Sequence, residues 1–534
     1  MHKADLSDVR LRTLPALLKL QAEHNPDTPY LVTDTESISF AEAYNTCLSL
    51  ASALSELGLQ KNDHLLLYLH NCPQMALLAL AANMLGAVWV PISTDYKGAW
   101  LDDAVQRSRP RIIATEAALV ERLSVADDTT LICIDPTPAG LLAKPPIAFD
   151  SLLNRPANQA DFSQIDYGDT CAIVWTSGTT GKSKGVMLSH NGWLRPIIHG
   201  ASLFYKSQPG DIIFNVLPMY HAGAWTTSVL RALVEGIPVV IEKSFSVSSF
   251  WARIEKFQAT QSFTLGAMHM FLWNAPEQEN DADNTLRVLQ AIPIAKELKA
   301  PFEKRFGLTL AGSGLGQSEC MLITTEAGAE QDIPDNSIGF ARPDTLVKVF
   351  DDQDREVPIG TVGEIRIQPL EPHIICNGYL DNPAATKQAW RGDWYCTGDL
   401  GYQDENGAFF FSDRKKDAIR FAGRNISTME VESVVRRHSA VADVAAFGIT
   451  CRELAAEEEL KIDVVLKPEH PLRHEELAKF INDNAPYYFV PRYMEFVAEL
   501  PYTPTNKVQK YVLRERGVSE QTWDINNSEF NVTR

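Results

Sequence analysis

Hydrophobic positions along the chain form short runs that are separated by helix-start and turn signals. The stretch Ser39-Phe40-Ala41-Glu42 is a capping box that opens an Ala/Leu-rich helix, and Gly58 closes this helix. A strand at 65–68, a helix after Pro73 and a strand at 87–90 follow. Because helices and strands alternate in this way, we expect a layered α/β architecture.

The longest apolar stretch, residues 76–92, raises the question of a membrane span. Asn83, Gly86 and Pro91 interrupt it, and it falls short of the ~20 residues that a span requires. We interpret it as a buried helix followed by a strand. Further strands are expected at four short apolar runs, with no internal repeat among them: 172–175, 212–217, 238–241 and 262–265.

The pattern changes near residue 400. A polar hairpin over 402–411, turning at Glu405-Asn406-Gly407, leads into the charged run Asp413-Arg414-Lys415-Lys416-Asp417. We therefore predict a large N-terminal domain of layered α/β subdomains, residues 1–413, and a small mobile α+β domain, residues 414–534. The polar tail from about Val518 is expected to be frayed.

Composition and charge narrow the class of function. The 534 residues carry a net charge of -19, which argues against a nucleic-acid binder or a protein held on anionic lipid. The eight cysteines are scattered, with no CxxC pair, as is usual for reduced thiols. The first residues show no signal-peptide pattern. We expect a cytoplasmic protein with a small-molecule partner and no stable membrane insertion; a homodimer is an open alternative.

The most informative stretch is TSGTTGKSKG, residues 176–185, which follows the apolar run 171–175. Its glycines can point backbone N–H groups inward, and its hydroxyls and Lys184 add donors, so it suits a phosphate group. A Walker P-loop would need a glycine at position 176, where Thr176 stands. A flexible surface turn is the ordinary alternative for such a composition.

This loop resembles the signature loop of the adenylate-forming superfamily, which includes acyl-CoA ligases, nonribosomal-peptide adenylation domains and luciferases. The resemblance extends in order through seven further motifs: PMYH at 218–221, GQSE at 316–319, GEI at 363–365, YCTGD at 395–399, DRKKD at 413–417, GRNIS at 423–427 with Glu430 and Glu432, and PTNKVQK at 504–510. The stretches GRNIS and TPTNKVQK are most similar to those of carnitine/crotonobetaine-type CoA ligases.

The resemblance implies an AMP-forming acid–thiol ligase, with ATP, Mg²⁺ and coenzyme A as cofactors and substrates. Such an enzyme joins a carboxylate to the α-phosphate of ATP, releases pyrophosphate and passes the acyl group to a thiol. Only about 24 residues follow Lys510, so we expect a separate acyl acceptor, coenzyme A being the simplest. Open alternatives are an acyl-AMP ligase that loads a carrier protein, a P-loop-like NTPase and a binder without turnover.

The resemblance also assigns roles to individual residues. It places the β- and γ-phosphates on the phosphate loop and Mg²⁺ on Glu319 with Thr176. Asp399 is expected to accept hydrogen bonds from the ribose hydroxyls, with Arg414 beside it. The nucleotide-binding set it implies is Thr176, Ser177, Gly178, Thr179, Thr180, Gly181, Lys184, Gln317, Ser318, Asp399, Arg414 and Gly423.

Two further residues are expected to act on the acyl group. Lys507 matches the family's catalytic lysine, placed between the carboxylate and the α-phosphate. His221 matches a position at the junction of acyl pocket and thiol channel, and a hydrogen-bonded core histidine is its ordinary alternative. By the same resemblance, Lys416 stands at the family's hinge position. Glu319, His221 and Lys507 are therefore the predicted catalytic residues.

The sequence departs from the family pattern at the predicted base pocket. Leu315 stands where relatives carry an aromatic residue that stacks on adenine, and residues 291–294 replace a glycine-rich turn. We expect the walls of the acyl pocket around 225–229 and 263–270. These side chains do not identify the acid.

Overall fold

The computed structural model of the chain describes most of its length. The described residues are 3–126, 129–136, 145–155, 163–176, 183–292, 294, 296–312, 314–326, 333–415, 417, 419–421, 424–450, 458–468, 470–503, 507–528 and 530–532. They divide into two compact units, which we describe separately. The first comprises Met1–Thr176, Lys184–Leu346 and Pro369–Gln388; the second comprises Ser177–Ser183, Val347–Gln368 and Ala389–Arg534.

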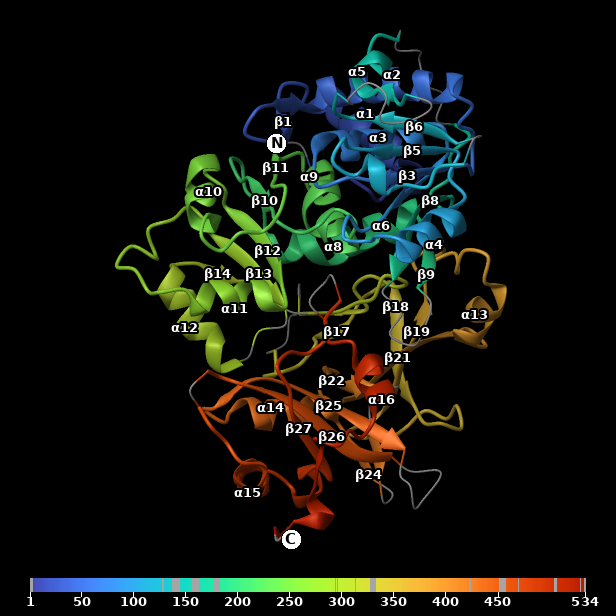
Figure 1. The fold of residues 1–534 in the computed structure, drawn as a ribbon. Helices are drawn as coiled ribbons and strands as arrows, with labels where there is room; N and C mark the ends of the chain where they lie inside the picture. Colours follow the sequence, from blue (N-terminus) through green and yellow to red (C-terminus); the bar gives the residue numbers. More distant parts are fainter. Residues whose placement is uncertain are drawn as a thin grey trace. The chain divides into compact units, whose positions relative to one another are not determined.

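The first unit contains a seven-stranded sheet in the order β7-β6-β5-β3-β4-β8-β9 (Figure 1). Neighbouring strands are parallel except for β8 and β9, which form an antiparallel edge pair. Strand bounds are β3 His64–Tyr68, β4 Val88–Pro91, β5 Ile112–Thr115, β6 Thr130–Cys133, β7 Ile147–Ala148, β8 Thr170–Thr176 and β9 Lys184–Ser189.

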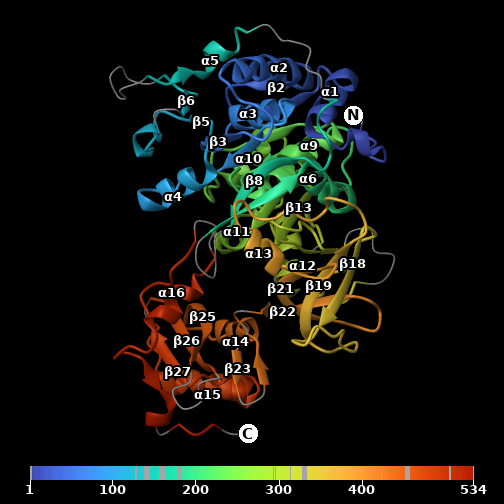
Figure 2. The ribbon, with the colours of Figure 1, turned by 90° about the vertical axis from the view of Figure 1, so that its right-hand side faces the viewer.

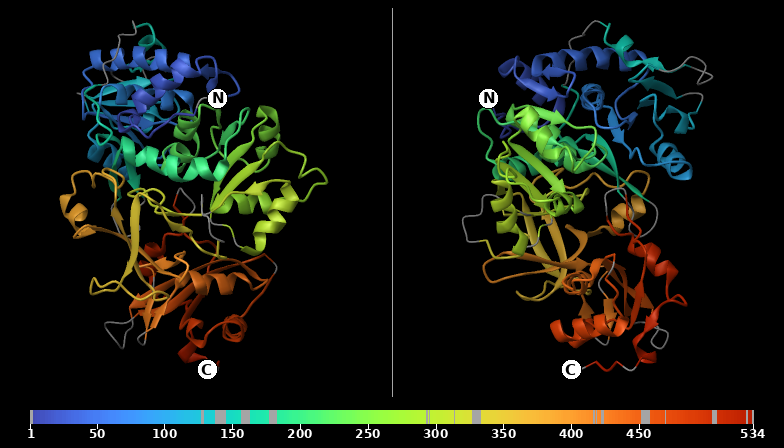
Figure 3. Two further views of the ribbon diagram at one scale, coloured as in Figure 1. Left: turned by 180° about the vertical axis from the view of Figure 1, so that it is seen from behind. Right: turned by 60° about the vertical axis from the view of Figure 1, so that its left-hand side comes forward.

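A second seven-stranded sheet of the same unit has the order β14-β13-β12-β10-β11-β1-β2, and only β2 is antiparallel to its neighbour. Most of its strands are drawn in green in Figure 3. A small three-stranded sheet, β15-β16-β17, completes the unit. Bounds are β1 Pro29–Val32, β2 Ser37–Ser39, β10 Ile213–Asn215, β11 Val239–Ile241, β12 Gln261–Leu265, β13 Val288–Ile292, β14 Thr309–Leu310, β15 Gly314–Leu315, β16 Thr324–Thr325 and β17 Phe340–Ala341.

Helices cover both sheets, and two stretches of the chain form π-helical turns, η3 and η4. The α-helices are α1 Leu14–His24, α2 Phe40–Glu56, α3 Pro73–Met84, α4 Ala99–Ser108, α5 Phe149–Leu152, α6 His190–Pro196, α7 Ser202–Tyr205, α8 Ala222–Ala224, α9 Leu230–Glu235, α10 Phe250–Phe257, α11 Ala267–Asn274, α12 Lys296–Phe306 and α13 Pro383–Gln388. The other helical turns are η1 Val9–Leu11, η2 Val120–Arg122, η3 Ile197–Ala201 and η4 Trp225–Val229.

The predicted start of α2 is confirmed in detail. The Ser39 hydroxyl accepts a hydrogen bond from the Glu42 amide, and the Glu42 carboxylate accepts one from the Ser39 amide. Gly58 has a φ of 89°, which suits the turn that follows the helix. α2 and α3 lie side by side (Figure 2), and every residue of α3 from Met75 onward is buried. The apolar stretch over 76–92 is thus a core helix and a strand, as predicted.

None of the helices in the described part of the chain combines the length and the apolar character that crossing a bilayer requires.

The second unit begins with a sheet in the order β18-β19-β21-β20, to which β22 adds by pairing with β21. The predicted hairpin at 402–411 is confirmed, because β21 and β22 are antiparallel and Gly407 in their turn has a φ of 87°. Bounds are β18 Thr345–Phe350, β19 Gly363–Pro369, β20 Trp390–Arg391, β21 Trp394–Gln403 and β22 Phe409–Arg414.

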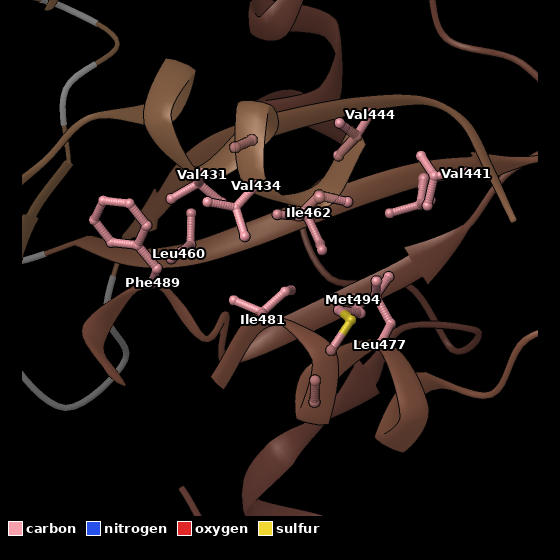
Figure 4. Packing of buried hydrophobic residues seen from close by; sticks show 14 of the residues in the cluster. Val431, Val434, Val441, Val444, Leu460, Ile462, Leu477, Ile481, Phe489 and Met494 are labelled. Atoms are coloured by element: carbon pink, nitrogen blue, oxygen red, sulfur yellow. The ribbon is translucent and has the colours of Figure 1, made fainter. Parts of the chain in front are cut away.

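The C-terminal part of this unit is a four-stranded sheet, β25-β26-β27-β28, with a separate pair, β23-β24. Figure 4 shows its core: Val431 and Val434 of α14 and Ile481 of α15 lie against strand residues such as Ile462. Bounds are β23 Ile419–Phe421, β24 Arg424–Ile426, α14 Thr428–Arg436, β25 Val441–Thr450, β26 Glu458–Leu466, α15 His474–Asn484, η5 Tyr487–Phe489, β27 Tyr493–Phe496, α16 Lys510–Arg516, β28 Trp523–Asp524 and η6 Ile525–Asn527.

The expectation that the tail is frayed from Val518 is wrong for the residues that the structure describes. β28 pairs with β27 through Met494 and Trp523. The Trp523 indole N–H donates to Glu475, and its ring lies nearly parallel to that of His474, with centroids 5.8 Å apart. One large aromatic side chain therefore docks an otherwise polar tail.

We predict that Trp523→Ala lowers the free energy of unfolding of the second unit by about 1–3 kcal/mol, because the ring stack and one hydrogen bond are lost. Urea unfolding followed by circular dichroism measures this change. Trp100→Ala is the matched control, since Trp100 is 59% exposed, and it should shift the free energy by no more than about 0.5 kcal/mol. Equal midpoints of urea unfolding for Trp523→Ala and Trp100→Ala would contradict the conclusion that Trp523 docks the tail.

Candidate active site

The predicted phosphate loop joins two antiparallel strands. β8 ends at Thr176 and β9 begins at Lys184, and these two residues are register partners. The Thr176 hydroxyl also donates to the Lys184 carbonyl oxygen at 3.3 Å, which closes the hairpin base. β8 is parallel to β4, so the loop leaves from the carboxyl edge of that sheet, where α/β proteins bind ligands. Residues 177–182, and with them five predicted phosphate contacts, lie outside the described residues.

A contact chain that the sequence analysis did not predict connects this hairpin to Glu319. The Lys184 ammonium lies over the Tyr379 ring, 4.7 Å from its centroid. The Tyr379 hydroxyl donates to the Glu319 carboxylate oxygen Oε1 at 2.9 Å. Tyr379 is held at this place because residues 377–380 run alongside β9, with backbone hydrogen bonds to Gly185 and Met187. Its aromatic ring and its position after a glycine were the only signals in the sequence.

Glu319 lies in the loop between β15 and β16. Within that loop Gln317 and Cys320 exchange backbone hydrogen bonds, and the Glu319 carbonyl oxygen accepts from the Cys376 amide at 2.7 Å. Glu319 is half-buried. The loop thus holds the carboxylate on a short, internally bonded turn, with Ser318 directly before it.

The side chains around Glu319 fit Mg²⁺ better than a metal whose ligands all come from protein side chains. Among the described residues no three His, Cys, Asp or Glu side chains are grouped so as to hold a metal ion. Mg²⁺ commonly uses one or two carboxylates together with phosphate oxygens. Tyr379 occupies Oε1, and Oε2 has no partner in the described part of the chain.

His221 precedes the short helix α8 and caps it. Its ring nitrogen Nδ1 accepts a hydrogen bond from the Gly223 amide at 3.1 Å, so the neutral ring carries its proton on Nε2. The side chain is half-buried. The predicted wall residues 225–229 follow directly as η4, in which Trp225 is buried and donates its indole N–H to Met219.

In the second unit, the predicted ribose-binding pair is formed by strand pairing. Asp399 on β21 and Arg414 on β22 are register partners, and the Arg414 Nε lies 2.8 Å from Asp399 Oδ1. The Asp399 side chain is fully buried, whereas Arg414 keeps 41% of its side chain exposed. An exposed guanidinium therefore partners a buried carboxylate.

Lys507 belongs to the electrostatic surroundings of this pair. Although the residue keeps exposed surface, burial of its ammonium group lowers the pKa of Lys507, and the charge of Arg414 lowers it further, while Asp399 acts in the opposite direction. Its backbone is tied to Thr503 by two hydrogen bonds, of 2.8 and 3.0 Å. The resemblance assigned Asp399 and Arg414 to the ribose and Lys507 to the reacting centre, and in the structure the charges of Asp399 and Arg414 act on the Lys507 ammonium.

A polar network in the same unit was not predicted. The Asp413 carboxylate accepts from the amide and the hydroxyl of Thr428, at 2.6 and 2.9 Å. The Lys510 ammonium donates to the same hydroxyl at 2.7 Å and pairs with Glu432 at 2.9 Å. This network links the end of β22 to the start of α16. Gly423 and Lys416 lie outside the described residues.

The residues of the predicted base pocket that differ from the family pattern include two buried ones, Leu315 and Ala291. Leu315 is 9% exposed, and its amide donates to the Thr324 hydroxyl at 3.4 Å. Ala291 is buried in β13, and the Ile292 carbonyl oxygen accepts from the Gly266 amide. Pro293 lies outside the described residues.

Comparison with known proteins identifies the family. The model of the AMP-binding enzyme family matches residues 18–380, and that of the AMP-binding enzyme C-terminal domain matches 430–507. A crotonobetaine/carnitine–CoA ligase from Escherichia coli O7:K1 is 30% identical over 481 residues, covering 88% of this chain and 92% of that protein.

Solved structures share the fold. ATP-bound MatB from Rhodopseudomonas palustris is 23% identical, with a TM-score of 0.83 over 94% of this chain and 99% of its own. A benzoate CoA ligase from Burkholderia xenovorans LB400 is also 23% identical, with a TM-score of 0.81 over 94% and 99%. The predicted α/β fold class and the predicted resemblance are confirmed. The chain belongs to the AMP-binding enzyme family, within its branch of AMP-forming acyl-CoA ligases.

Proposed function

We propose that the chain is an ATP-dependent carboxylate–CoA ligase. An oxygen of the acid attacks the α-phosphorus of ATP, the bond to the β-phosphate breaks and pyrophosphate leaves. The sulfur of coenzyme A then attacks the acyl carbon, and AMP leaves. The observation that supports this proposal is the contact chain from Lys184 at the start of β9 through Tyr379 to Glu319, which connects a cation with an oriented carboxylate.

The first unit would hold the triphosphate. The reaction brings an anion to a polyanion, so its catalysis consists mainly of positioning and charge stabilisation. In our assignment Thr176 and Lys184 contact phosphate oxygens together with loop residues 177–181, and Gln317 and Ser318 lie beside the nucleotide. Mg²⁺, held by Glu319 with Thr176 as a second candidate ligand, would neutralise charge on the phosphate oxygens.

The second unit would hold the ribose and the reacting centre. In our assignment Asp399 accepts hydrogen bonds from the ribose hydroxyls, and the ion pair with Arg414 holds its carboxylate in position. Lys507 supplies the positive charge between the acid and the α-phosphate. The lowered pKa of Lys507 reflects burial, which also strengthens any interaction its ammonium makes with phosphate oxygens.

His221 would control access of the thiol. Its half-buried side chain caps the short helix α8 directly before the predicted wall residues 225–229, which supports this assignment.

We also propose that residues 414–534 form a domain that moves between the two half-reactions, with its hinge at Lys416. Coenzyme A as acceptor, a homodimer and the absence of a nucleic-acid partner belong to this proposal.

A panel of carboxylic acids, incubated with ATP, Mg²⁺ and coenzyme A, tests the function. The proposal requires AMP and pyrophosphate as products, and an acyl-CoA thioester with at least one acid. Carnitine and crotonobetaine belong in the panel, because relatives bear their names. ADP and phosphate would indicate an NTPase, and AMP release without a CoA thioester would favour a carrier-protein acceptor.

We predict that Lys507→Ala reduces adenylation by ~10²–10⁴-fold and leaves thioester formation from a supplied acyl-adenylate largely intact, because the lysine's charge acts on the first transition state. Pyrophosphate release and thioester formation, measured separately, check this. Equal losses in both half-reactions would remove Lys507 from its assigned role.

We predict that Tyr379→Phe lowers the rate of pyrophosphate release by about 10-fold or more and raises the Mg²⁺ concentration needed for half-maximal rate, because a hydrogen bond to a charged group contributes about 1.5–3 kcal/mol. Tyr379→Leu removes the ring beneath Lys184 as well and should be more severe. An unchanged Mg²⁺ dependence in Tyr379→Phe would show that Tyr379 does not orient Glu319.

A further inference from the structure

Asn71 connects the two large sheets of the first unit. It lies between the end of β3, at Tyr68 in the first sheet, and the start of α3, at Pro73. Its side-chain amide donates hydrogen bonds to the carbonyl oxygens of Leu217 at 2.8 Å and Glu242 at 2.9 Å. Leu217 comes shortly after β10 and Glu242 directly after β11, both strands of the second sheet. One side chain therefore joins the carboxyl ends of parallel strands from both sheets.

A third hydrogen bond uses the amide oxygen of Asn71. Its Oδ1 accepts from the Met219 backbone amide at 2.6 Å. An asparagine amide offers two N–H donors and one acceptor oxygen, so these three bonds use both donors and the oxygen. Because the oxygen must face the Met219 N–H, the pattern allows one orientation of the amide group. Asn71 thus holds the backbone on both sides of Pro218.

Two further side chains hold the same turn. The Asn215 side chain donates to the Leu217 carbonyl oxygen at 3.0 Å, and the Trp225 indole N–H donates to the Met219 carbonyl oxygen at 2.6 Å. Leu217 and Met219 are buried. Of these three holding side chains, Asn71 is the one that comes from a strand end of the first sheet. It therefore sets where the turn lies relative to that sheet.

The segment that carries Asn71 is itself held in place. Glu116 directly follows β5, the parallel neighbour of β3, and its side chain is buried. Its carboxylate accepts a hydrogen bond from the His70 amide at 3.3 Å and lies 2.6 Å from the His70 ring nitrogen Nδ1. On the other side Pro73 is the first residue of α3. Asn71 therefore extends from rigid elements, as precise positioning requires.

The turn that Asn71 holds leads directly into His221. The His221 amide donates to the Pro218 carbonyl oxygen at 3.0 Å, and its Nδ1 accepts from the Gly223 amide. The predicted phosphate loop follows β8 of the first sheet, whereas His221 follows β10 of the second. The carboxyl ends of parallel strands are where α/β proteins bind ligands. The position of His221 relative to the first sheet thus depends on the contacts of Asn71.

We propose that Asn71 is a positioning residue for His221, which keeps the turn 217–221 in the place that transfer of the acyl group to coenzyme A requires. The inference rests on the role of His221 in the proposed function. A displacement of about 1 Å near the reacting atoms can lower a rate by about 10²-fold, so the loss of these contacts is enough to slow this step. Adenylation is assigned to other residues, so the second half-reaction loses more.

Asn71→Asp keeps the shape of the side chain and removes both donors. With an acid that the panel shows to be active, we expect acyl transfer from a supplied acyl-adenylate to coenzyme A to fall by about 10–10²-fold. The ratio of this rate to the rate of pyrophosphate release should fall at least about 10-fold. Asn71→Ala adds no charge and should lower the ratio as well. An unchanged ratio, with or without equal losses in both rates, would overturn the inference.

Asn83→Asp is the matched control, because Asn83 makes the same kinds of contact at the other end of α3. Its amide donates to the carbonyl oxygens of Ala87 and Cys171, each at 2.9 Å, and accepts from the Trp89 indole N–H at 3.3 Å. These contacts remain within the first sheet and its helix. Asn83→Asp should therefore lower stability and both rates together, with the ratio unchanged. A ratio lowered as much as in Asn71→Asp would overturn the inference.

A double-mutant cycle with His221→Ala tests the route of the effect. Because Asn71 acts through His221, Asn71→Asp should change acyl transfer little in the His221→Ala background, although it lowers acyl transfer in the wild-type background. Losses that multiply in the double variant would show that Asn71 acts by another route, which would overturn the inference.

Three outcomes separate this inference from the proposed function. Wild-type protein that forms no CoA thioester with any acid overturns both. Active wild-type protein with an unchanged ratio in Asn71→Asp overturns only the role of Asn71. If neither Asn71 variant folds by circular dichroism while Asn83→Asp does, Asn71 serves the fold and not the turn, and the inference is again overturned alone.

Discussion

The hydrogen bond from the Tyr379 hydroxyl to the Glu319 carboxylate joins three segments that are far apart in the sequence. Residues 377–380 run beside β9, which begins at Lys184, and they present the Tyr379 ring to that lysine. The phosphate loop starts and ends on this β8–β9 hairpin. One phenol side chain therefore connects Lys184, the first residue of β9, with the carboxylate expected to hold Mg²⁺.

The loop that carries Glu319 depends in turn on buried charge. Arg195 and Arg342 both donate hydrogen bonds to the carboxylate of Asp344, and Arg195 also donates one to the Met321 carbonyl oxygen. Removing one partner of such a buried group leaves an uncompensated charge, which is far more costly than losing a surface pair. This anchoring explains how the chain sustains a leucine at positive φ directly beyond the Glu319 turn.

The second unit uses strand register for the same purpose. Asp399 and Arg414 meet because they are opposite one another on antiparallel strands, and their ion pair is a consequence of the hairpin turn at Gly407. Lys507 shares their electrostatic surroundings. A register slip of one residue in β22 would turn Arg414 to the other face of the sheet and separate it from Asp399. The relative position of Asp399 and Arg414 is therefore set by the backbone pairing of their strands.

The amino-acid sequence by itself determined the local helices, strands and turns and the types of residue expected at the site. The capping box at Ser39, the core helix α3 and the hairpin at Gly407 follow from short-range rules, and the motifs around Glu319, Asp399 and Lys507 carry enough residues to predict the family. The prediction of a frayed tail was wrong because the polar composition of the tail does not indicate that Trp523 packs against His474 and hydrogen-bonds to Glu475.

Only the tertiary structure decided what joins these motifs. Tyr379, Arg195 and Asn71 have no distinctive sequence signal, since an isolated tyrosine, arginine or asparagine fits many environments. Their surroundings arise from contacts between distant segments, such as Arg195 with Asp344, 149 residues apart, and Tyr379 with Glu319, 60 residues apart. Propensity and periodicity describe neighbours along the chain, whereas the position of a side chain such as the Glu319 carboxylate is set by packing between distant segments.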